Sequence, residues 1–101
     1  MQTNIRTDNN ELQIVLSDRL TFEDHEAFRD VIMAIKKNEQ ATCSIDLASL
    51  TAIDSAGLGM LMIAFETSEK VNKPFKIKRA NGQVKRLLEI SEFEKVMTIE
   101  N

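Results

Sequence analysis

The sequence predicts one α/β domain over residues 1–101, a mixed β-sheet with helices packed on it, in the order β-β-α-β-α-β-α with a possible last short strand. Three observations support this prediction. A chain of 101 residues has room for one hydrophobic core. Apolar residues alternate with a period of two in some stretches and recur every three or four residues in others. The stretches of helical period are long enough to connect parallel strands.

The beginning of the chain is typical of an antiparallel pair of strands. Residues 11–18, ELQIVLSD, place Leu12, Ile14 and Leu16 on one face, which is the pattern of a half-buried strand. Residues 3–7 are expected to form a short partner strand. The intervening Asp-Asn-Asn at 8–10 suits the turn between them.

Residues 20–38 are predicted to form an amphipathic helix. Thr21, with Asp24 three positions later, resembles an N-terminal cap, and Lys36 and Lys37 suit the negative end of the helix dipole. The apolar residues recur at helical spacing, and the inward face is predicted to comprise Phe22, His25, Phe28, Ile32 and Ile35.

The rest of the chain alternates between strands and helices. A strand is predicted at 42–47, and residues 48–54 are expected to form a loop that leads to Ser55. A helix follows from 56 to about 71 and ends before Pro74. The inward side chains of the strand are predicted to be Cys43, Ile45 and Leu47. The remaining segments are a strand at 75–80, a short helix at 82–91 and a stretch at 93–100 that suits either a strand or a helical turn.

Composition and charge indicate a cytoplasmic protein that neither enters a membrane nor binds nucleic acid. The net charge is −3, and no aromatic residues alternate with the basic ones to make a stacking platform for single strands. The longest apolar run, residues 60–65, is too short to span a bilayer, and the first ten residues do not resemble a signal peptide. The single cysteine suits a reducing compartment.

One stretch is strongly basic. Residues 70–86 contain seven lysines and arginines with no acidic residue among them. Such a block can face an acidic partner or a phosphate, but a solvated strand face beside a helix rim is the more ordinary explanation.

Residues 52–65, AIDSAGLGMLMIAF, do not support an enzyme or a metal site. A serine-nucleophile elbow requires glycine where Ile53 stands, and the only histidine, His25, falls on an apolar helix face. The Gly-x-Gly at 57–59 lacks the lysine of a phosphate-binding loop. Asp46 and Asp54 have no histidine or cysteine partner close by in the sequence. We therefore predict no catalytic residue, no metal and no cofactor.

Two explanations of this stretch stay open at this point. In the first, Ser55 is the N-cap of the helix, and Gly57 and Gly59 let the helix start approach the sheet. In the second, one helix face is a protein-docking surface, because no charge occurs before Glu66. At 100° per residue the core face is predicted to hold Leu58, Leu61, Met62 and Phe65. The opposite, docking face is predicted to hold Ala56, Gly59, Met60, Ile63, Ala64 and Thr67.

A hydroxyl beside an uncharged docking surface is well placed to act as a switch. Phosphorylation of Ser55 would add roughly −1.5 to −2 charges. The start of a helix tolerates an anion, so the fold is expected to survive. A partner covering the surface would have to desolvate that anion, which costs several kcal/mol.

The motif IDLASLTAIDSAGLGMLM at 45–62, followed by PFKIKRANGQVKRLLEISEFEKVMTI at 74–99, resembles the STAS domain of bacterial anti-sigma factor antagonists. The resemblance implies that Ser55 is phosphorylated by an anti-sigma factor with serine kinase activity and dephosphorylated by a PPM-type serine phosphatase. It also implies that the unphosphorylated form binds the anti-sigma factor and releases a sigma factor. By this resemblance the docking surface comprises Asp54, Ser55, Ala56, Gly57, Leu58, Gly59 and Met60, and the helical pattern adds Ile63.

One residue departs from the family pattern. Many members carry an aspartate at the start of the first helix, where this chain has Thr21. We do not transfer that role to Asp18 or Asp24. An alternative of another class is a STAS accessory subunit of an ABC-type lipid transporter, which docks without phosphorylation. Ser55 beside Asp54 favours the switched regulator, since a purely structural subunit does not require that hydroxyl.

Overall fold

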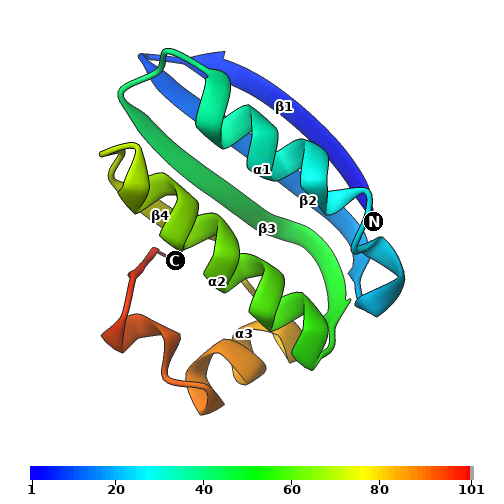
Figure 1. Cartoon of the computed structure of the whole chain (residues 1–101). Coiled ribbons are helices and arrows are strands. Elements are labelled where there is room, and N and C mark those ends of the chain that lie inside the picture. Colours follow the sequence, from blue (N-terminus) through cyan, green and yellow to red (C-terminus); the bar gives the residue numbers. More distant parts are fainter. Residues whose placement is uncertain (101) are drawn as a thin grey trace.

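The computed structural model describes residues 1–100 and contains one five-stranded mixed sheet. The strands lie side by side in chain order (Figure 1). The first pair is antiparallel and every later pair is parallel, as the helical connections predict. The strands are β1 (Gln2–Asp8), β2 (Glu11–Leu20), β3 (Thr42–Ile53), β4 (Phe75–Lys78) and β5 (Thr98–Glu100).

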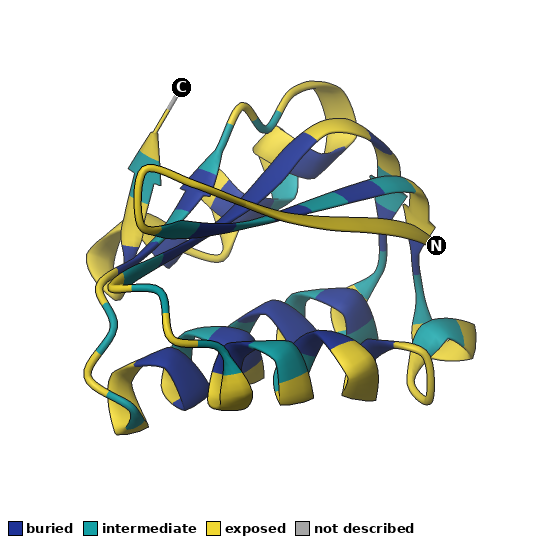
Figure 2. Cartoon of the chain, turned by 90° about the horizontal axis from the view of Figure 1, so that it is seen from above, coloured by how far each residue is buried: buried dark blue, intermediate teal, exposed yellow. Residues whose placement is uncertain are grey.

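Three α-helices cover the two faces of this sheet. Figures 1 and 2 show α1 and α2 running side by side along one face, while α3 lies on the opposite face. The helices are α1 (Phe28–Lys37), α2 (Ser55–Lys70) and α3 (Gly82–Ile90), with short 3₁₀ turns η1 (Phe22–Asp24) and η2 (Phe93–Lys95). None of the helices within residues 1–100 has both the length and the apolarity to cross a membrane.

The hairpin predicted at the N-terminus is present. Asp8 pairs with Glu11, so only Asn9 and Asn10 form the turn, with φ angles of 50° and 62°. Asparagine tolerates this left-handed backbone better than most residues, and two such residues suit a two-residue hairpin turn.

The core is centred on β3, which is longer than its pattern indicates. Cys43, Ile45 and Leu47 are buried as predicted. The loop predicted at 48–54 is wrong, because β3 continues to Ile53 and pairs there with the end of β2. Two register shifts in that pair break the strict alternation, which explains why the sequence pattern ends early.

The helix predicted at 20–38 is divided in two. The Thr21 backbone N–H donates to Asp24 Oδ2 at 2.8 Å, but this cap closes only the η1 turn, and α1 begins at Phe28. The break changes the helical phase, so Phe22 and His25 are exposed rather than in the core. The buried residues of α1 are Phe28, Val31 and Ile35, and Ile32 is half-buried.

Candidate functional site at the start of α2

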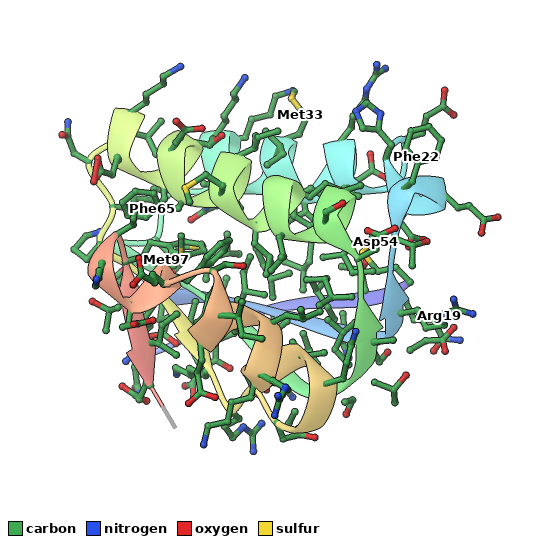
Figure 3. The ribbon with its side chains drawn as sticks, turned by 90° about the horizontal axis from the view of Figure 1, so that it is seen from below. Arg19, Phe22, Met33, Asp54, Phe65 and Met97 are labelled. Atoms are coloured by element: carbon green, nitrogen blue, oxygen red, sulfur yellow. The ribbon has the colours of Figure 1, made fainter. Side chains whose placement is uncertain are left out.

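Asp54 joins two elements at the end of β3. Its carboxylate accepts a hydrogen bond from the backbone N–H of Gly57 at 2.8 Å, which caps α2. The other carboxylate oxygen accepts from the backbone N–H of Phe22 at 3.1 Å, which fixes the η1 turn. Figure 3 shows Asp54 and Phe22 on neighbouring elements. One side chain therefore sets the position of η1 relative to the start of α2.

Ser55 does not cap the helix, contrary to the first of the two explanations. The N-cap is Asp54, whose backbone is extended, and Ser55 is the first residue of α2. The Ser55 side chain is exposed, and its hydroxyl makes no hydrogen bond within residues 1–100. The hydroxyl therefore does not stabilise the fold by hydrogen bonding in the part of the chain that the structure describes.

The two glycines after Ser55 differ in their surroundings. A Cβ on Gly57 would lie 2.4 Å from the backbone oxygen of Leu20 and 2.6 Å from Ile53 Cγ1, so glycine is required for this close approach. A Cβ on Gly59 would have no neighbour within 4 Å. The close approach predicted for both glycines is confirmed for Gly57 and wrong for Gly59.

The docking face predicted on α2 is partly wrong. Met60 is 4% exposed and belongs to the core, and Gly57 is buried against β2. Ala64 and Thr67 are also buried. The helix is rotated by about 100°, or one residue, from the predicted phase. The reason is that α2 is apolar all round near its start, so the pattern cannot decide which side approaches the sheet, and Gly57 permits the closest approach. The residues that face inward are Gly57, Met60, Leu61, Ala64, Thr67 and Ser68.

The exposed side of α2 still offers an uncharged surface. Ser55, Gly59 and Ile63 are exposed at a spacing of four residues, and Ile63 is 49% exposed. Ala56 and Leu58 are half-buried beside them. We call Ser55, Ala56, Leu58, Gly59 and Ile63 the outer stripe of α2. Eight residues are predicted to bind a partner. Ser55, Gly59 and Ile63 are exposed, Asp54, Ala56 and Leu58 are half-buried, and Gly57 and Met60 are buried.

Phe22 is a surface residue that the sequence analysis placed in the core. Its side chain is 73% exposed, and Asp54 holds its backbone next to the start of α2. The capping pair Thr21 and Asp24 is the signal that could have revealed it, because such a pair can close a single turn as well as a long helix.

Four of the seven basic residues at 70–86 bind acceptors within the domain, namely Lys73, Lys76, Lys78 and Arg79. Lys78 Nζ lies 2.9 Å from Glu11 Oε2, which also accepts from the Ser44 hydroxyl. Arg79 binds the carboxylate of Asp46. Burial raises the pKa of the Asp46 carboxyl, but the hydrogen bonds from Arg79 and from the Ala48 backbone outweigh it and hold the pKa below its ordinary value. These pairings favour the structural explanation of the basic stretch.

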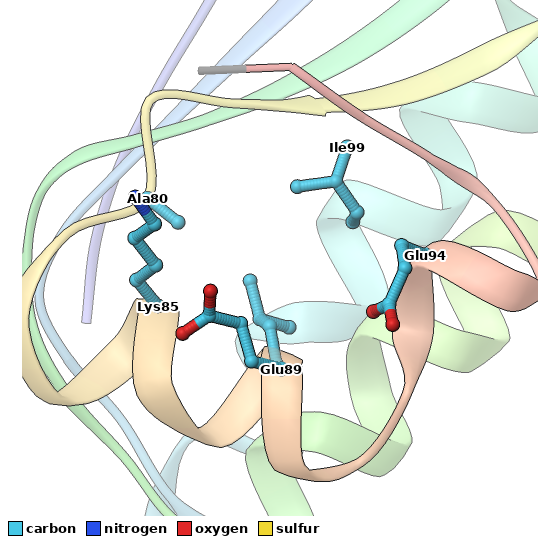
Figure 4. A pocket seen from close by; sticks show the side chains of 6 residues that line it. Ala80, Lys85, Glu89, Glu94 and Ile99 are labelled. Carbon is cyan, nitrogen blue, oxygen red and sulfur yellow. The ribbon is translucent and has the colours of Figure 1, made fainter.

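Among the hollows on the surface of residues 1–100, two bear on the candidate site. One, of about 430 Å³, is bounded by α3, η2 and β5 (Figure 4) and includes none of the outer stripe. The other, of about 490 Å³, lies beside Asp54 between η1 and the ends of β2 and β3. Residues 1–100 contain no cluster of three or more metal-ligating side chains. Burial raises the pKa of the Cys43 thiol to about 12, so this cysteine is not a reactive nucleophile.

A family model described as "Mlab, STAS domain" matches residues 3–99. The chain belongs to the STAS domain family. A curated STAS-domain containing protein of Pseudomonas aeruginosa is 29% identical over 92 residues, which cover 91% of this chain and 90% of that protein. The family predicted from the residues around Ser55 is therefore confirmed.

Solved structures of STAS proteins share the fold. An anti-sigma factor antagonist from Mycobacterium paratuberculosis has a TM-score of 0.86 at 19% identity, covering 98% of this chain and 84% of that one. The Bacillus cell fate determinant SpoIIAA in its phosphorylated form has a TM-score of 0.72 at 18% identity, covering 99% and 92%. A sulfate transporter family protein from Wolinella succinogenes has a TM-score of 0.77 at 12% identity, covering 94% and 80%. The STAS fold thus occurs in both regulators and transport proteins.

Proposed function

We propose that this STAS domain is a non-enzymatic, phosphorylation-switched regulator that binds another protein in the cytoplasm. The unphosphorylated form binds an anti-sigma factor with serine kinase activity and thereby releases a sigma factor or a related regulatory output. Phosphorylation of Ser55 blocks this binding, and a PPM-type serine phosphatase reverses the block. The partner contacts the outer stripe of α2 with Asp54 at its edge.

The exposed Ser55 hydroxyl is the observation that carries this proposal. Asp54 caps the helix, so the serine oxygen is not needed for the fold. An exposed hydroxyl at the first position of a 16-residue helix is accessible to a kinase. The named relative SpoIIAA, which shares the fold, exists in a phosphorylated form, and this supports the same chemistry here.

The position of Ser55 explains how one phosphate can block a partner and spare the domain. The first N–H groups of α2 and its dipole favour a negative charge at this end. Asp54 opposes this effect, but hydrogen bonds from Gly57 and Phe22 partly offset its charge. A partner seated on Gly59 and Ile63 would instead bury the phosphate, which costs several kcal/mol without a compensating cation.

The test combines phosphate mapping with binding. A candidate serine kinase from the same genome, incubated with ATP and this protein, is expected to add one phosphate, located at Ser55 by mass spectrometry. Calorimetric titration of the same kinase with Ser55→Asp is expected to give a dissociation constant at least tenfold larger than with the unmodified protein. This corresponds to a loss of about 1.4 kcal/mol or more of binding free energy. Ser91→Asp carries the same charge on an exposed serine after α3 and is expected to bind like the unmodified protein. Equal binding by Ser55→Asp would contradict the switch.

A second candidate is a STAS accessory subunit of an ABC-type lipid transporter. The likeness to a sulfate transporter family protein supports a transport role for this fold. In that case the outer stripe docks on an ATPase and Ser55 is not modified. Ser55→Ala distinguishes the two, since it abolishes phosphorylation in the first and leaves transport unchanged in the second.

A further inference from the structure

β1 is an edge strand that nothing in the described chain covers. All seven of its residues are exposed, and Figure 2 shows β1 as an exposed ribbon along the edge of the sheet. Its ladder with β2 runs without interruption from Gln2 to Asp8. Edge strands are usually protected by a bulge, a proline, charged side chains or short length. β1 has no bulge or proline and spans seven residues, and its two charged residues, Arg6 and Asp8, lie on the face opposite to Ile5.

The hairpin turn decides which backbone groups of β1 point outward. With a two-residue turn, Asp8 and Glu11 exchange both ladder hydrogen bonds, and bonding then alternates along the strand. Gln2, Asn4 and Arg6 therefore bond to β2, like Asp8. The outer edge presents the N–H and C=O groups of Thr3, Ile5 and Thr7.

The same three residues lie on the core side of the sheet. Ile5 pairs with Ile14, which is fully buried, so the Ile5 side chain continues the core at its rim. Its side chain is 41% exposed. An occupant that bonds to this edge would also cover Ile5.

We propose that the occupant is a second copy of this chain, paired antiparallel through β1 with Ile5 on the two-fold axis. In this register Thr3 faces Thr7 of the second copy, and the outward backbone groups of both strands are satisfied together. The side-chain pairs agree with it. Ile5 meets Ile5, Asn4 meets Arg6, and Gln2 meets Asp8, so no like charges stand opposite each other. An isologous interface needs this self-complementarity.

The dimer leaves the candidate site free. β1 lies at one edge of the sheet, two strands away from β3, which leads into α2 (Figure 1). The two sheets join into one continuous sheet, and each copy keeps its Ser55 accessible. The inference does not depend on the proposed function.

Paired charge variants at Ile5 test the register. Sedimentation equilibrium of the unmodified protein is expected to show a concentration-dependent dimer. Ile5→Lys and Ile5→Glu place like charges across the axis, so each alone is expected to sediment as a monomer. An equimolar mixture of the two is expected to recover a one-to-one dimer, because opposite charges then meet.

Two further variants complete the experiment. Ile5→Val keeps the apolar pair and is expected to dimerise like the unmodified protein. Ile5→Pro removes an N–H that points away from β2, so the domain is expected to fold, by circular dichroism, and to remain monomeric. An unmodified protein that is monomeric up to about 1 mM, a concentration at which binding of about −4 kcal/mol is detected, would overturn the proposal. A dimer that persists in Ile5→Lys would overturn it as well.

Discussion

Asp54 and Ser55 are adjacent residues, but only the Asp54 side chain makes hydrogen bonds within the described chain. The Asp54 carboxylate is occupied by the backbone N–H groups of Gly57 and Phe22, at 2.8 and 3.1 Å. The Ser55 hydroxyl has no partner among residues 1–100. At this scale, the carboxylate that caps α2 and the exposed hydroxyl that we propose as the switch belong to two residues joined by one peptide bond.

This separation predicts different effects on stability. Asp54→Ala leaves two N–H groups without their acceptor and is expected to lower the free energy of unfolding by about 1–2 kcal/mol. Ser55→Ala removes no hydrogen bond and is expected to change it by less than about 0.5 kcal/mol. Urea denaturation followed by circular dichroism measures both. If Ser55→Ala lowered the free energy of unfolding more than Asp54→Ala does, Ser55 rather than Asp54 would be the N-cap of α2.

The two glycines of α2 form a matched pair. Gly57→Ala forces a methyl group against the Leu20 carbonyl and the Ile53 side chain, and is expected to destabilise the domain by about 1–3 kcal/mol. Gly59→Ala meets nothing within 4 Å and is expected to stabilise it by about 0.5–1 kcal/mol, through helix propensity. Thermal unfolding of the two variants should move in opposite directions, and a shift in the same direction would refute this account.

At the scale of the element, α2 has one face for the core and one for solvent. Met60 and Leu61 face the sheet, while Gly59 and Ile63 face outward. The inward face includes the small residues Gly57 and Ala64, and Gly57 brings the start of the helix close to Leu20. Consequently the larger Leu58 and Phe65 stay only half-buried at its sides.

The two faces are expected to respond differently to truncation. Met60→Ala opens a cavity in the core and is expected to cost about 2–4 kcal/mol of stability. Ile63→Ser changes a half-exposed position and is expected to cost less than about 1 kcal/mol. Under the proposed function, Ile63→Ser weakens the partner complex. Urea denaturation and calorimetric titration of both variants check these expectations. A Met60→Ala variant as stable as the unmodified protein would show that Met60 is not part of the core.

An ion pair that responds to acid joins Asp46 of β3 to Arg79, the residue directly after β4. The Asp46 pKa is lowered in the folded protein, because hydrogen bonds from Arg79 and from the Ala48 backbone outweigh the raising effect of burial. A lowered pKa gives stability that is present above the ordinary carboxyl pKa and is lost as the pH falls through the folded value. Stability is therefore expected to fall as the pH drops through and below the ordinary carboxyl range, near pH 4.

In Arg79→Gln, Asp46 stays buried but loses its main hydrogen-bond donor. The free energy of unfolding is therefore expected to change less with pH in the acid range. Urea midpoints measured at several pH values give the slope. Lys85→Gln is the matched control, because Lys85 forms no ion pair within residues 1–100. An unchanged slope in Arg79→Gln would show that the pair does not contribute.

At the scale of the molecule, the buried side chains of the helices and strands form one hydrophobic core, and the strands of the sheet lie in chain order. The central strand β3 is buried along residues 43–47, because Cys43, Ile45 and Leu47 belong to the hydrophobic core, while Ser44 and Asp46 on the other face bind the side chains of Glu11 and Arg79. Cys43 lies in this strand and is 1% exposed. Its thiol therefore reports on opening of the whole domain.

Thiol labelling is expected to measure global stability. Because burial raises the Cys43 pKa to about 12, the native thiol is expected to resist a disulfide reagent at neutral pH. The opening free energy derived from labelling rates should equal the free energy of unfolding from urea. Labelling that is complete within the mixing time would contradict this, and so would a much lower opening free energy.

The N-terminal pair shows what local pattern can decide. The alternation of Leu12, Ile14 and Leu16, together with two asparagines, predicts a hairpin, but the turn is Asn9 and Asn10 rather than residues 8–10, so the pairing of Asp8 with Glu11 sets the register. Likewise, residues 45–62 together with residues 74–99 are sufficient to indicate the family, which the family model over residues 3–99 confirms. These features depend on neighbours in sequence, so the chain itself carries the information.

The phase of α2 and the position of Phe22 show what local pattern cannot decide. Residues 56–65 are apolar on every side, so only the steric fit of Gly57 against Leu20 selects the inward face. Phe22 faces solvent because Asp54, 32 residues later, holds its turn in place. The sequence by itself determined the order of elements and singled out Ser55 as the candidate switch, whereas the tertiary structure alone decided which side chains surround that serine, because close packing joins residues that the chain keeps apart.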